Sequence, residues 1–414
     1  MERIHHALPR TSYVHSRARA YNLGPRARVL RRHQSLDRSN FINYITGDKT
    51  MNYRQPIHKS QRAMLCLLIA AHNEEMVLEN TLRSAIAAGM KPEHIYVVDD
   101  CSTDPTTKIA RTILPHDNVH KVRRSGKGLA LSKANKKFRL TDRYRWIHIA
   151  DADGAFAPNY FSEFRKNLRV ENAAATGYIK SLPGKRISEY RVFEYTVGME
   201  LHRRIQSLLG VISIVPGPTS CFRSDVFAQL DFTTGAMTED FDVTLQMYRK
   251  GLGKIQFIPS AIAYTQDPLN TKSFIKQITR WNRGVLQGVV RHNIGRKASP
   301  IDAYLTYQIS QSLLLVLNCF IWVPYMMLSK GGTSFLATSF IMDVLLTFLI
   351  TLMVCMRTRR WDAMSAFPII YGLKWLSLLI FVKAFVEVVI LRKFKISKGY
   401  WENGTGRRYK LATS

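Results

Sequence analysis

The sequence predicts an α/β domain with a doubly wound, Rossmann-like sheet, followed by a C-terminal α-helical transmembrane region. In the first half of the chain, short apolar runs alternate with segments of helical spacing, an order typical of parallel strands joined by helices. Three apolar segments follow near 303–328, 334–356 and 366–391. A helix needs roughly 20 apolar residues to cross a bilayer, and the first two segments meet this requirement.

We therefore divide the chain into four parts, with expected bounds 1–62, 63–300, 301–391 and 392–414. The first is polar and basic, lacks an apolar run long enough for a signal peptide, and is typical of a disordered or membrane-associated segment. The second is the α/β domain, which ends in an amphipathic helix. The third is the transmembrane region and the fourth is a basic tail.

Charge and cysteine content narrow the class of protein. The 414 residues carry 60 Lys and Arg against 30 Asp and Glu, a formal net charge of +30. More than half of the excess lies at the ends, because 1–62 has 13 basic and 3 acidic residues and 392–414 has 7 and 1. Zinc-finger, RNP-type and basic-zipper motifs are missing, so we expect anionic membrane lipids, and no nucleic acid, as the partner. The five cysteines form no CxxC pair and are expected to be reduced thiols.

Three apolar runs, at 64–71, 95–98 and 146–150, are expected to be buried parallel strands. Helical patterns at 74–89 and 104–113 follow the first and second of them. In such sheets, ligands bind outside the carboxyl ends of the strands. Each expected strand is followed there by polar side chains: His72, Asn73 and Glu74; Asp99 and Asp100; Asp151 and Asp153. This coincidence predicts a site at that edge.

Asp151 and Asp153 form an Asp-x-Asp pair after the third strand. Two carboxylates one residue apart on a turn can face one hard cation, and Mg²⁺ or Mn²⁺ takes oxygen ligands and also bridges phosphates. The pair predicts a metal that stabilises a leaving diphosphate. A solvated acidic loop is the alternative, because the pattern is common.

Two further features at this edge suit a nucleotide. Asp100 can accept hydrogen bonds from a nucleobase or a ribose, or it can cap the next helix together with Ser102 or Asp104. Lys127 lies between two glycines, where the backbone can approach a phosphate and the ammonium can add charge. A plain basic loop is nearly as well supported, and no Walker A motif is present.

The sequence Thr238-Glu239-Asp240 precedes a helical pattern at 240–249. On local sequence the simplest interpretation is structural: Thr238 caps the helix, and acidic residues occupy its first turn. The functional interpretation is that Asp240 is a general base for an acceptor hydroxyl, which must then lie within hydrogen-bond distance.

A basic amphipathic helix is predicted just before the first apolar segment, in TKSFIKQITRWNRGVLQGVVRH. Its apolar residues recur at three- and four-residue spacing, and its five Lys and Arg residues favour the membrane surface. Within it, Arg280 can pair with a phosphate and Trp281 can stack on a sugar. An interfacial anchor with snorkelling side chains is the alternative.

The third apolar segment, 366–391, differs from the first two because it contains Lys374, Lys383 and Glu387. It can tilt, lie partly in the interface, or use these groups in a polar cavity. A simple third crossing would place the tail of net charge +6 outside, against the positive-inside rule. We therefore expect this segment to be partly interfacial or re-entrant and the tail to stay cytoplasmic.

The ordered set of motifs strongly resembles the processive family-2 glycosyltransferases: the cellulose, chitin and hyaluronan synthases and, most closely, the bacterial poly-N-acetylglucosamine synthases. The resemblance covers about residues 64–300 and continues more weakly through the apolar segments. The matching pieces are Ala71-His72-Asn73-Glu74-Glu75, Val98-Asp99-Asp100, Asp151-Ala152-Asp153, Thr176-Gly177, Glu194-Tyr195 with Gln206-Ser207, Thr238-Glu239-Asp240, and the QxxRW of Gln277, Arg280 and Trp281.

This resemblance implies a GT-A fold, a UDP-sugar donor, N-acetylglucosamine as the sugar, and a β product formed by a single inverting displacement. It implies a catalytic base, donor ligands, acceptor ligands and ligands for Mg²⁺ or Mn²⁺. The catalytic base would be Asp240, and the metal ligands would be Asp151 and Asp153. The acceptor ligands would be Glu239 and Trp281. The donor ligands would be Glu74, Asp100, Lys127, Asp151, Gln277 and Arg280.

The resemblance also implies a multi-pass protein of the cell membrane whose catalytic domain faces the cytoplasm, where UDP-sugars occur. The acceptor would be a growing polysaccharide or a lipid-linked sugar. Two or three spans would build only a small channel, so an accessory subunit or a second copy of the chain is an expected partner. The chain departs from the family pattern at 215–220 and at Tyr178, and no apolar span precedes its catalytic domain.

Two other functions stay open. A non-processive enzyme that moves one sugar to a lipid acceptor would share the donor chemistry, although QxxRW favours chain elongation. A basic protein that binds membranes or nucleic acid without enzymatic activity would need no carboxylates at three strand ends, and the sequence has them.

Overall fold

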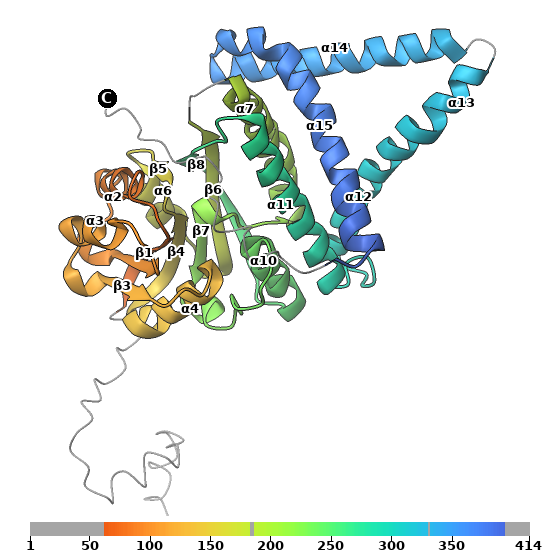
Figure 1. The fold of residues 1–414 in the computed structure, drawn as a ribbon. Helices are drawn as coiled ribbons and strands as arrows, with labels where there is room; N and C mark the ends of the chain where they lie inside the picture. Colours follow the sequence, from red (N-terminus) through yellow and green to blue (C-terminus); the bar gives the residue numbers. More distant parts are fainter. Residues whose placement is uncertain (1–61, 183–185, 330–331, 394–414) are drawn as a thin grey trace, which may run out of the picture. The chain divides into compact units, whose positions relative to one another are not determined.

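The computed structural model describes residues 62–182, 186–329 and 332–393 of the chain (Figure 1). Nearly all of the expected N-terminal segment and of the basic tail lie outside these ranges. The predicted domain bounds therefore stay a prediction.

A mixed sheet organises the α/β domain, and its described strands follow the order β3-β2-β1-β4-β7-β6-β8-β5. Its first four members are mutually parallel, so the three expected strands are confirmed and are neighbours. The strands are β1 (Ala63–Ala71), β2 (Ile95–Asp100), β3 (Val119–Val122), β4 (Tyr144–Asp151), β5 (Gly154–Phe156), β6 (Asn172–Ser181), β7 (Ser220–Arg223) and β8 (Lys254–Thr265).

The second half of the sheet, for which the sequence pattern predicts no strands, is of mixed direction. Strand β7 runs antiparallel to both β4 and β6, and β5 runs antiparallel to β8. These two strands have only four and three residues, so no alternation can show in the sequence. Pairing with longer neighbours holds them in place. The doubly wound prediction rests on the strands expected at 64–71, 95–98 and 146–150 and is confirmed for them. It does not extend to β5 and β7.

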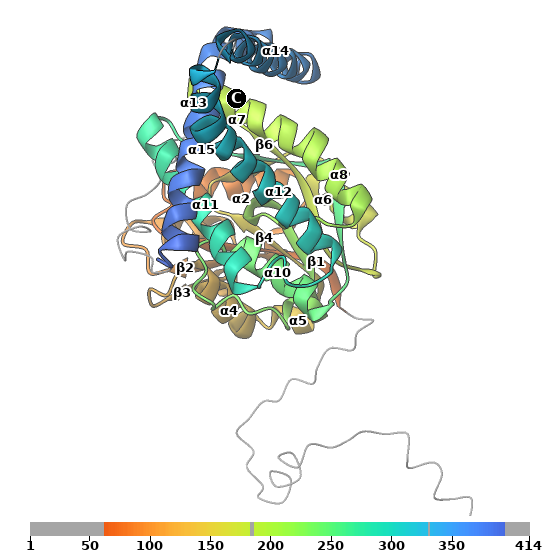
Figure 2. The same ribbon diagram turned by 90° about the vertical axis from the view of Figure 1, so that its right-hand side faces the viewer.

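Helices pack on the sheet and form two cores, one on each face (Figures 1 and 2). Alternate residues of β1 supply both, because Leu67 and Ile69 pack with α2, α3 and α6 whereas Cys66 and Leu68 pack with α4, α5, α9 and α10. A strand buried on both faces is apolar throughout, which is why the sequence reveals it. These helices are α2 (Leu78–Ala87), α3 (Thr106–Ile113), α4 (Lys127–Phe138), α5 (Leu140–Arg143), α6 (Tyr160–Asn167), α9 (Ser224–Phe227) and α10 (Glu239–Lys250).

The remaining structure is mostly helical, and α7, η6 and α8 follow one another without a break. Its longer elements are α7 (Arg186–Val197), η6 (Gly198–Arg203), α8 (Arg204–Leu209), α11 (Thr271–Arg291), α12 (Pro300–Leu317), η8 (Asn318–Trp322), α13 (Val323–Leu328), α14 (Gly332–Thr358), α15 (Phe367–Phe385) and η10 (Val386–Ile390). Its short turns are η4 (Pro92–His94), η5 (His116–Asn118), η7 (Gly217–Thr219) and η9 (Trp361–Ala366).

Two helical segments of the described chain, Pro300–Leu328 and Gly332–Thr358, are long and apolar enough to cross a bilayer, judged by length and composition. They correspond to the first two predicted spans. The third apolar segment forms α15, which lies beside α11 in both views (Figures 1 and 2). A transmembrane region that includes all three stays a proposal.

Candidate active site

The register of the sheet brings the polar strand ends together, as the sequence predicts. Ala71 of β1 lies opposite Asp99 of β2, and Ala70 lies opposite Asp151 of β4. His72 follows β1, and its Nδ1 is 2.9 Å from the carbonyl oxygen of Asp100. These ends border a cleft of about 480 Å³, a volume typical of small-molecule sites.

Nine of the ten predicted site residues line this cleft. They are Glu74, Asp100, Lys127, Asp151, Asp153, Glu239, Asp240, Arg280 and Trp281. The tenth, Gln277, is only 1% exposed within α11 and does not line the cleft. Lys276, Arg280 and Trp281 form the cleft-facing side of this turn of α11 instead.

Lys127 bridges two walls of the cleft. Its Nζ lies 2.6 Å from Asp151 Oδ1 and 2.8 Å from Glu239 Oε1. Burial alone would lower the pKa of Lys127, but the two carboxylates outweigh burial and hold this pKa above its ordinary value. The charged ammonium thus ties the end of β4 to the start of α10.

Asp240 lies beside this bridge, half-buried in the cleft wall. The backbone N–H of Phe241 donates to Oδ1 at 2.9 Å, and that of Gly217 donates to Oδ2 at 3.3 Å. Burial and then the charge of Glu239 raise the pKa of Asp240 to about 6, although Lys127 acts to lower it. A carboxylate that titrates near neutrality is suited to take a proton from a hydroxyl.

Two glycines permit close approaches around Asp240. A Cβ at Gly217 would lie 3.0 Å from both Asp151 Oδ1 and Lys127 Nζ, so a side chain at this position would press on the bridge. A Cβ at Gly284 would lie 2.4 Å from Thr238 Oγ1. Gly284 therefore sets how near α11 comes to the start of α10. Thr238 stands at the N-cap position, as expected, but makes no capping hydrogen bond.

The carboxylate of Asp100 orders the loop that carries Lys127. It accepts hydrogen bonds from the backbone N–H groups of Ser125 at 2.7 Å and Gly126 at 2.8 Å, and it pairs with Arg124 at 2.9 Å. Helix capping falls to Asp104, which accepts from the N–H of Thr106 at 3.0 Å. The expected contact of Asp100 with a nucleobase stays a prediction.

Asp151 and Asp153 both line the cleft. Within the described ranges, no group of three or more His, Cys, Asp or Glu side chains is arranged to hold a metal by itself. Mg²⁺ sites for phosphate substrates use one or two carboxylates and complete their coordination with water and phosphate oxygens. The donor set therefore fits a divalent metal that arrives with a diphosphate.

Arg191 is a site residue that the sequence does not indicate. Its side chain is 1% exposed, and its guanidinium carbon lies 4.6 Å from the ring centres of both Trp281 and Tyr195. Glu194 pairs with it, and Asp267 Oδ1 is 3.6 Å from its Nε. This stack holds the Trp281 ring in place. In the sequence, Arg191 is one of several charged residues of α7 and cannot be told from a surface arginine.

Further cations line the cleft without a sequence signal, namely Arg124, Arg203 and Lys276. Arg203 is 5% exposed and donates to the carbonyl oxygen of Ile214 at 2.6 Å. Burial lowers the pKa of Arg203 to about 10, which still leaves it charged at neutral pH. Cations and carboxylates are thus interspersed around one opening, an arrangement suited to a diphosphate and a metal.

A cleft at the carboxyl ends of parallel strands, with paired aspartates, a bridging lysine and a buried carboxylate, is typical of enzymes that act on nucleotide-activated substrates. Residues 146–379, more than half of the chain, match the profile of glycosyl transferase family group 2, and the chain belongs to this family. The predicted family is thereby confirmed.

Two curated relatives of this chain are synthases that are named after a polysaccharide. The poly-β-1,6-N-acetyl-D-glucosamine synthase of Staphylococcus aureus is 23% identical over 243 residues, 57% of this chain and 58% of that protein. The hyaluronan synthase of Streptococcus pyogenes is 26% identical over 278 residues, 60% of this chain and 64% of that protein. The matched region spans less than two thirds of each relative.

Among solved structures, a mannosyltransferase of Pyrobaculum calidifontis in complex with GDP-mannose and Mn²⁺ is similar, with a TM-score of 0.51. It is 16% identical, and the match covers 78% of this chain and 88% of that chain. This likeness concerns the fold, which is the GT-A glycosyltransferase fold.

Proposed function

We propose that the protein is a membrane-bound, inverting glycosyltransferase that moves N-acetylglucosamine from its UDP-sugar to a growing polysaccharide. The observation that carries the proposal is the position of Asp240, whose pKa is raised to about 6 in the cleft that also contains Asp151, Asp153 and Trp281. The names of the two relatives support a polysaccharide product.

In the proposed reaction, the acceptor sugar lies against Trp281 and Asp240 removes the proton of the attacking hydroxyl. The hydroxyl oxygen forms a bond to the anomeric carbon while the bond from that carbon to the diphosphate oxygen breaks, and UDP leaves. Attack from the face opposite the leaving group converts an α-linked donor into a β-linked product. Arg191 fixes the Trp281 ring and thereby the acceptor.

Asp151 and Asp153 would hold Mg²⁺ or Mn²⁺, which would stabilise the charge that develops on the leaving diphosphate. Lys127 and Arg280 also line the cleft and would add positive charge near the diphosphate. Glu74 is proposed to contact the nucleoside, and Glu239 the acceptor. Gln277 keeps its predicted donor role in this proposal, as a buried residue on the same face of α11 as Arg280 and Trp281.

The proposed location is the cell membrane, with the catalytic domain in the cytoplasm. The two apolar helical segments and the basic, amphipathic α11 support it. Large apolar side chains on α12 to α14, such as Leu314, Phe320 and Phe340, are exposed and suit either lipid or a partner helix. An accessory subunit or a second copy of the chain would cover part of this surface.

The test is a purified protein in lipid nanodiscs, offered a panel of UDP-sugars with Mg²⁺ or Mn²⁺, with UDP release and product mass as readouts. We expect UDP release with one sugar and a ladder of product masses. Asp240→Asn should lower turnover about 10²–10⁴-fold, as the loss of a positioned base does. Addition of a single sugar to lipid would identify the non-processive alternative. No UDP release from any donor would refute the proposal.

A further inference from the structure

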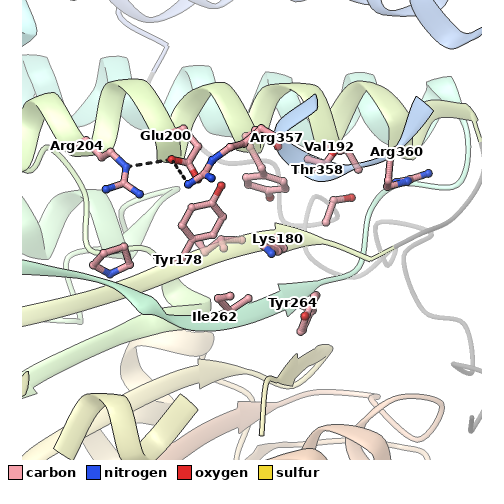
Figure 3. Close-up of a pocket in the computed structure, with 15 residues that line it drawn as sticks. Tyr178, Lys180, Val192, Glu200, Arg204, Ile262, Tyr264, Arg357, Thr358 and Arg360 are labelled. Carbon is pink, nitrogen blue, oxygen red and sulfur yellow. Dashed lines mark hydrogen bonds and ion pairs between the residues drawn. The ribbon is translucent and has the colours of Figure 1, made fainter. Parts of the chain in front are cut away.

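A second cavity, of about 440 Å³, adjoins the candidate active-site cleft; Figure 3 shows its lining. Three parts of the fold enclose it: the paired strands β6 and β8, the continuous helix α7–η6–α8, and the end of α14 with the turn that follows. Its polar lining consists of Tyr178, Lys180, Ser181, Tyr195, Thr196, Glu200, Arg204, Tyr264, Arg357, Thr358 and Arg360.

The lining is strongly basic. The lining contains one carboxylate, that of Glu200, and four cations: Lys180, Arg204, Arg357 and Arg360. Glu200 holds two of these cations at once, with Arg204 Nε at 3.1 Å and Arg357 Nε at 3.2 Å (Figure 3). One carboxylate therefore orients two guanidinium groups and cannot neutralise both. The cavity keeps a net positive charge.

The other two lining cations are Arg360 and Lys180. Arg360 pairs at 2.5 Å with Glu189, which lies outside the lining. Lys180 is exposed, and its Nζ lies 5.8 Å from the ring centre of Tyr178. Among the described side chains, no carboxylate lies within ion-pair distance of Lys180. Its ammonium is the cation most available to an incoming anion.

Hydroxyl groups complete the lining. Burial and then the charge of Glu200 raise the pKa of Tyr178, so its hydroxyl remains protonated at physiological pH. Thr196, Thr358 and Ser181 add further hydroxyl groups. Cations combined with neutral hydroxyl donors are the groups that bind phosphate oxygens.

The cavity is next to the catalytic machinery. Ile179 and Tyr195 line both this cavity and the catalytic cleft. The Tyr195 hydroxyl accepts a hydrogen bond from Arg191 at 2.8 Å, and Arg191 stacks on Trp281. An occupant that touches Tyr195 thus contacts the same stack that positions the acceptor platform.

We infer that this cavity binds a phosphate-bearing anion. Its volume lies in the range of small-molecule sites and admits a group larger than phosphate itself. Arg357 and Arg360 stand at the end of the second candidate span, so phospholipid headgroups are one source of the anion if α14 crosses the bilayer. A free phosphate compound from the cytoplasm is the other. The inference does not depend on the proposed sugar or on processivity.

The test measures the unfolding midpoint of the detergent-purified full chain by tryptophan fluorescence. The ligands are dihexanoyl-phosphatidylglycerol below its micellar concentration, dihexanoyl-phosphatidylcholine, and inorganic phosphate. We expect a ligand that binds to raise the midpoint by about 2–4 °C at tenfold excess over its Kd. A rise with phosphatidylglycerol alone identifies a lipid headgroup, and an equal rise with inorganic phosphate identifies a free anion.

Lys180→Gln is the principal variant, because Lys180 is exposed and its loss breaks no ion pair. It should weaken the anion's affinity about tenfold, and Lys180→Gln with Arg360→Gln should abolish the shift. The matched control is Lys272→Gln, which removes one exposed charge from α11, outside the cavity. The inference would be overturned if no anion raises the unfolding midpoint of the unmodified protein. It would also be overturned if the single variant, the double variant and the control all keep the same rise.

Discussion

Removing the negative charge of Glu239 and removing the positive charge of Lys127 should shift the acid limb of the pH–rate profile in opposite directions. Asp240 must be deprotonated to act as a base, so activity should fall as the pH drops through its pKa of about 6. Glu239 raises this pKa and Lys127 lowers it. Glu239→Gln should therefore shift the limb to lower pH, and Lys127→Met should shift it to higher pH.

The size of the shift follows from Coulomb's law. A unit charge at roughly 6 Å and an effective dielectric constant of about 20 contributes about 2.8 kcal/mol, or about two pH units. The cleft is open to water, because the side chains of Lys127 and Glu239 are 24% and 15% exposed. Screening by this water should reduce each shift to about one pH unit.

The assay records initial rates of UDP release between pH 5 and 9 at low donor concentration, which gives kcat/KM. Both variants will also lose absolute rate, but the midpoint of the limb does not depend on the amplitude. Asp240→Asn is the control and should remove the limb together with most of the activity. If the midpoint stays within about 0.3 pH units in both charge variants, a group other than Asp240 controls the acid limb.

Four further outcomes are expected. Asp153→Ala should lose Mn²⁺ binding, measured by electron paramagnetic resonance, as well as turnover; unchanged binding would exclude the Asp-x-Asp site. Arg191→Met should raise the acceptor KM about tenfold while donor hydrolysis continues, with partial rescue in Arg191→Lys; equal loss of both reactions would mean a purely structural role. Burial alone would raise the pKa of Asp242, but hydrogen bonds to the carboxylate hold this pKa at about 2. The folded protein should therefore lose up to about 2 kcal/mol of stability as the pH falls from 4 to 2. In Asp242→Asn the unfolding midpoint should no longer depend on pH in this way. A Cys at Ser414 in an otherwise Cys-free chain should resist an impermeant thiol reagent on intact cells; ready labelling would place the tail outside.

The sequence predicts those helices and strands whose own residues carry the pattern, such as a continuous apolar run or helical spacing. β1 is apolar along its whole length because both of its faces are buried, and polar residues mark where it ends. Helix α10 is expected at 240–249 and runs from Glu239 to Lys250. By contrast, β5 and β7 exist because distant strands offer them pairing partners. Three or four consecutive residues cannot indicate which distant strand they will pair with, so the sequence does not predict these two strands.

The same distinction applies to the candidate site. Asp151 is predictable because it follows a strand, but its bridge to Glu239 through Lys127 joins residues that are far apart in the chain. The rotation of α11 about its axis is also set by packing, since Gly284 fits against Thr238. Gln277 is buried on the same face of α11 as Arg280 and Trp281, and its motif does not indicate that burial.

The contacts of α15 with α11 and α14 bear on the interpretations that its sequence leaves open. Along its length it packs on α11, near Phe274 at one end and near Leu286 at the other. Charged residues of α15 and of η10, which continues it, are paired: Lys374 of α15 with Asp343 of α14 at 2.6 Å, and Glu387 of η10 with Arg283 of α11 at 2.6 Å. Two helices that pack lengthwise share one inclination to the bilayer. If α11 lies on the membrane surface, as its basic amphipathic sequence predicts, then α15 lies close to that surface, but Lys374 pairs near the middle of α14, so part of α15 enters the bilayer if α14 crosses it. Both contacts together fit the expected partly interfacial or re-entrant segment, which stays a prediction.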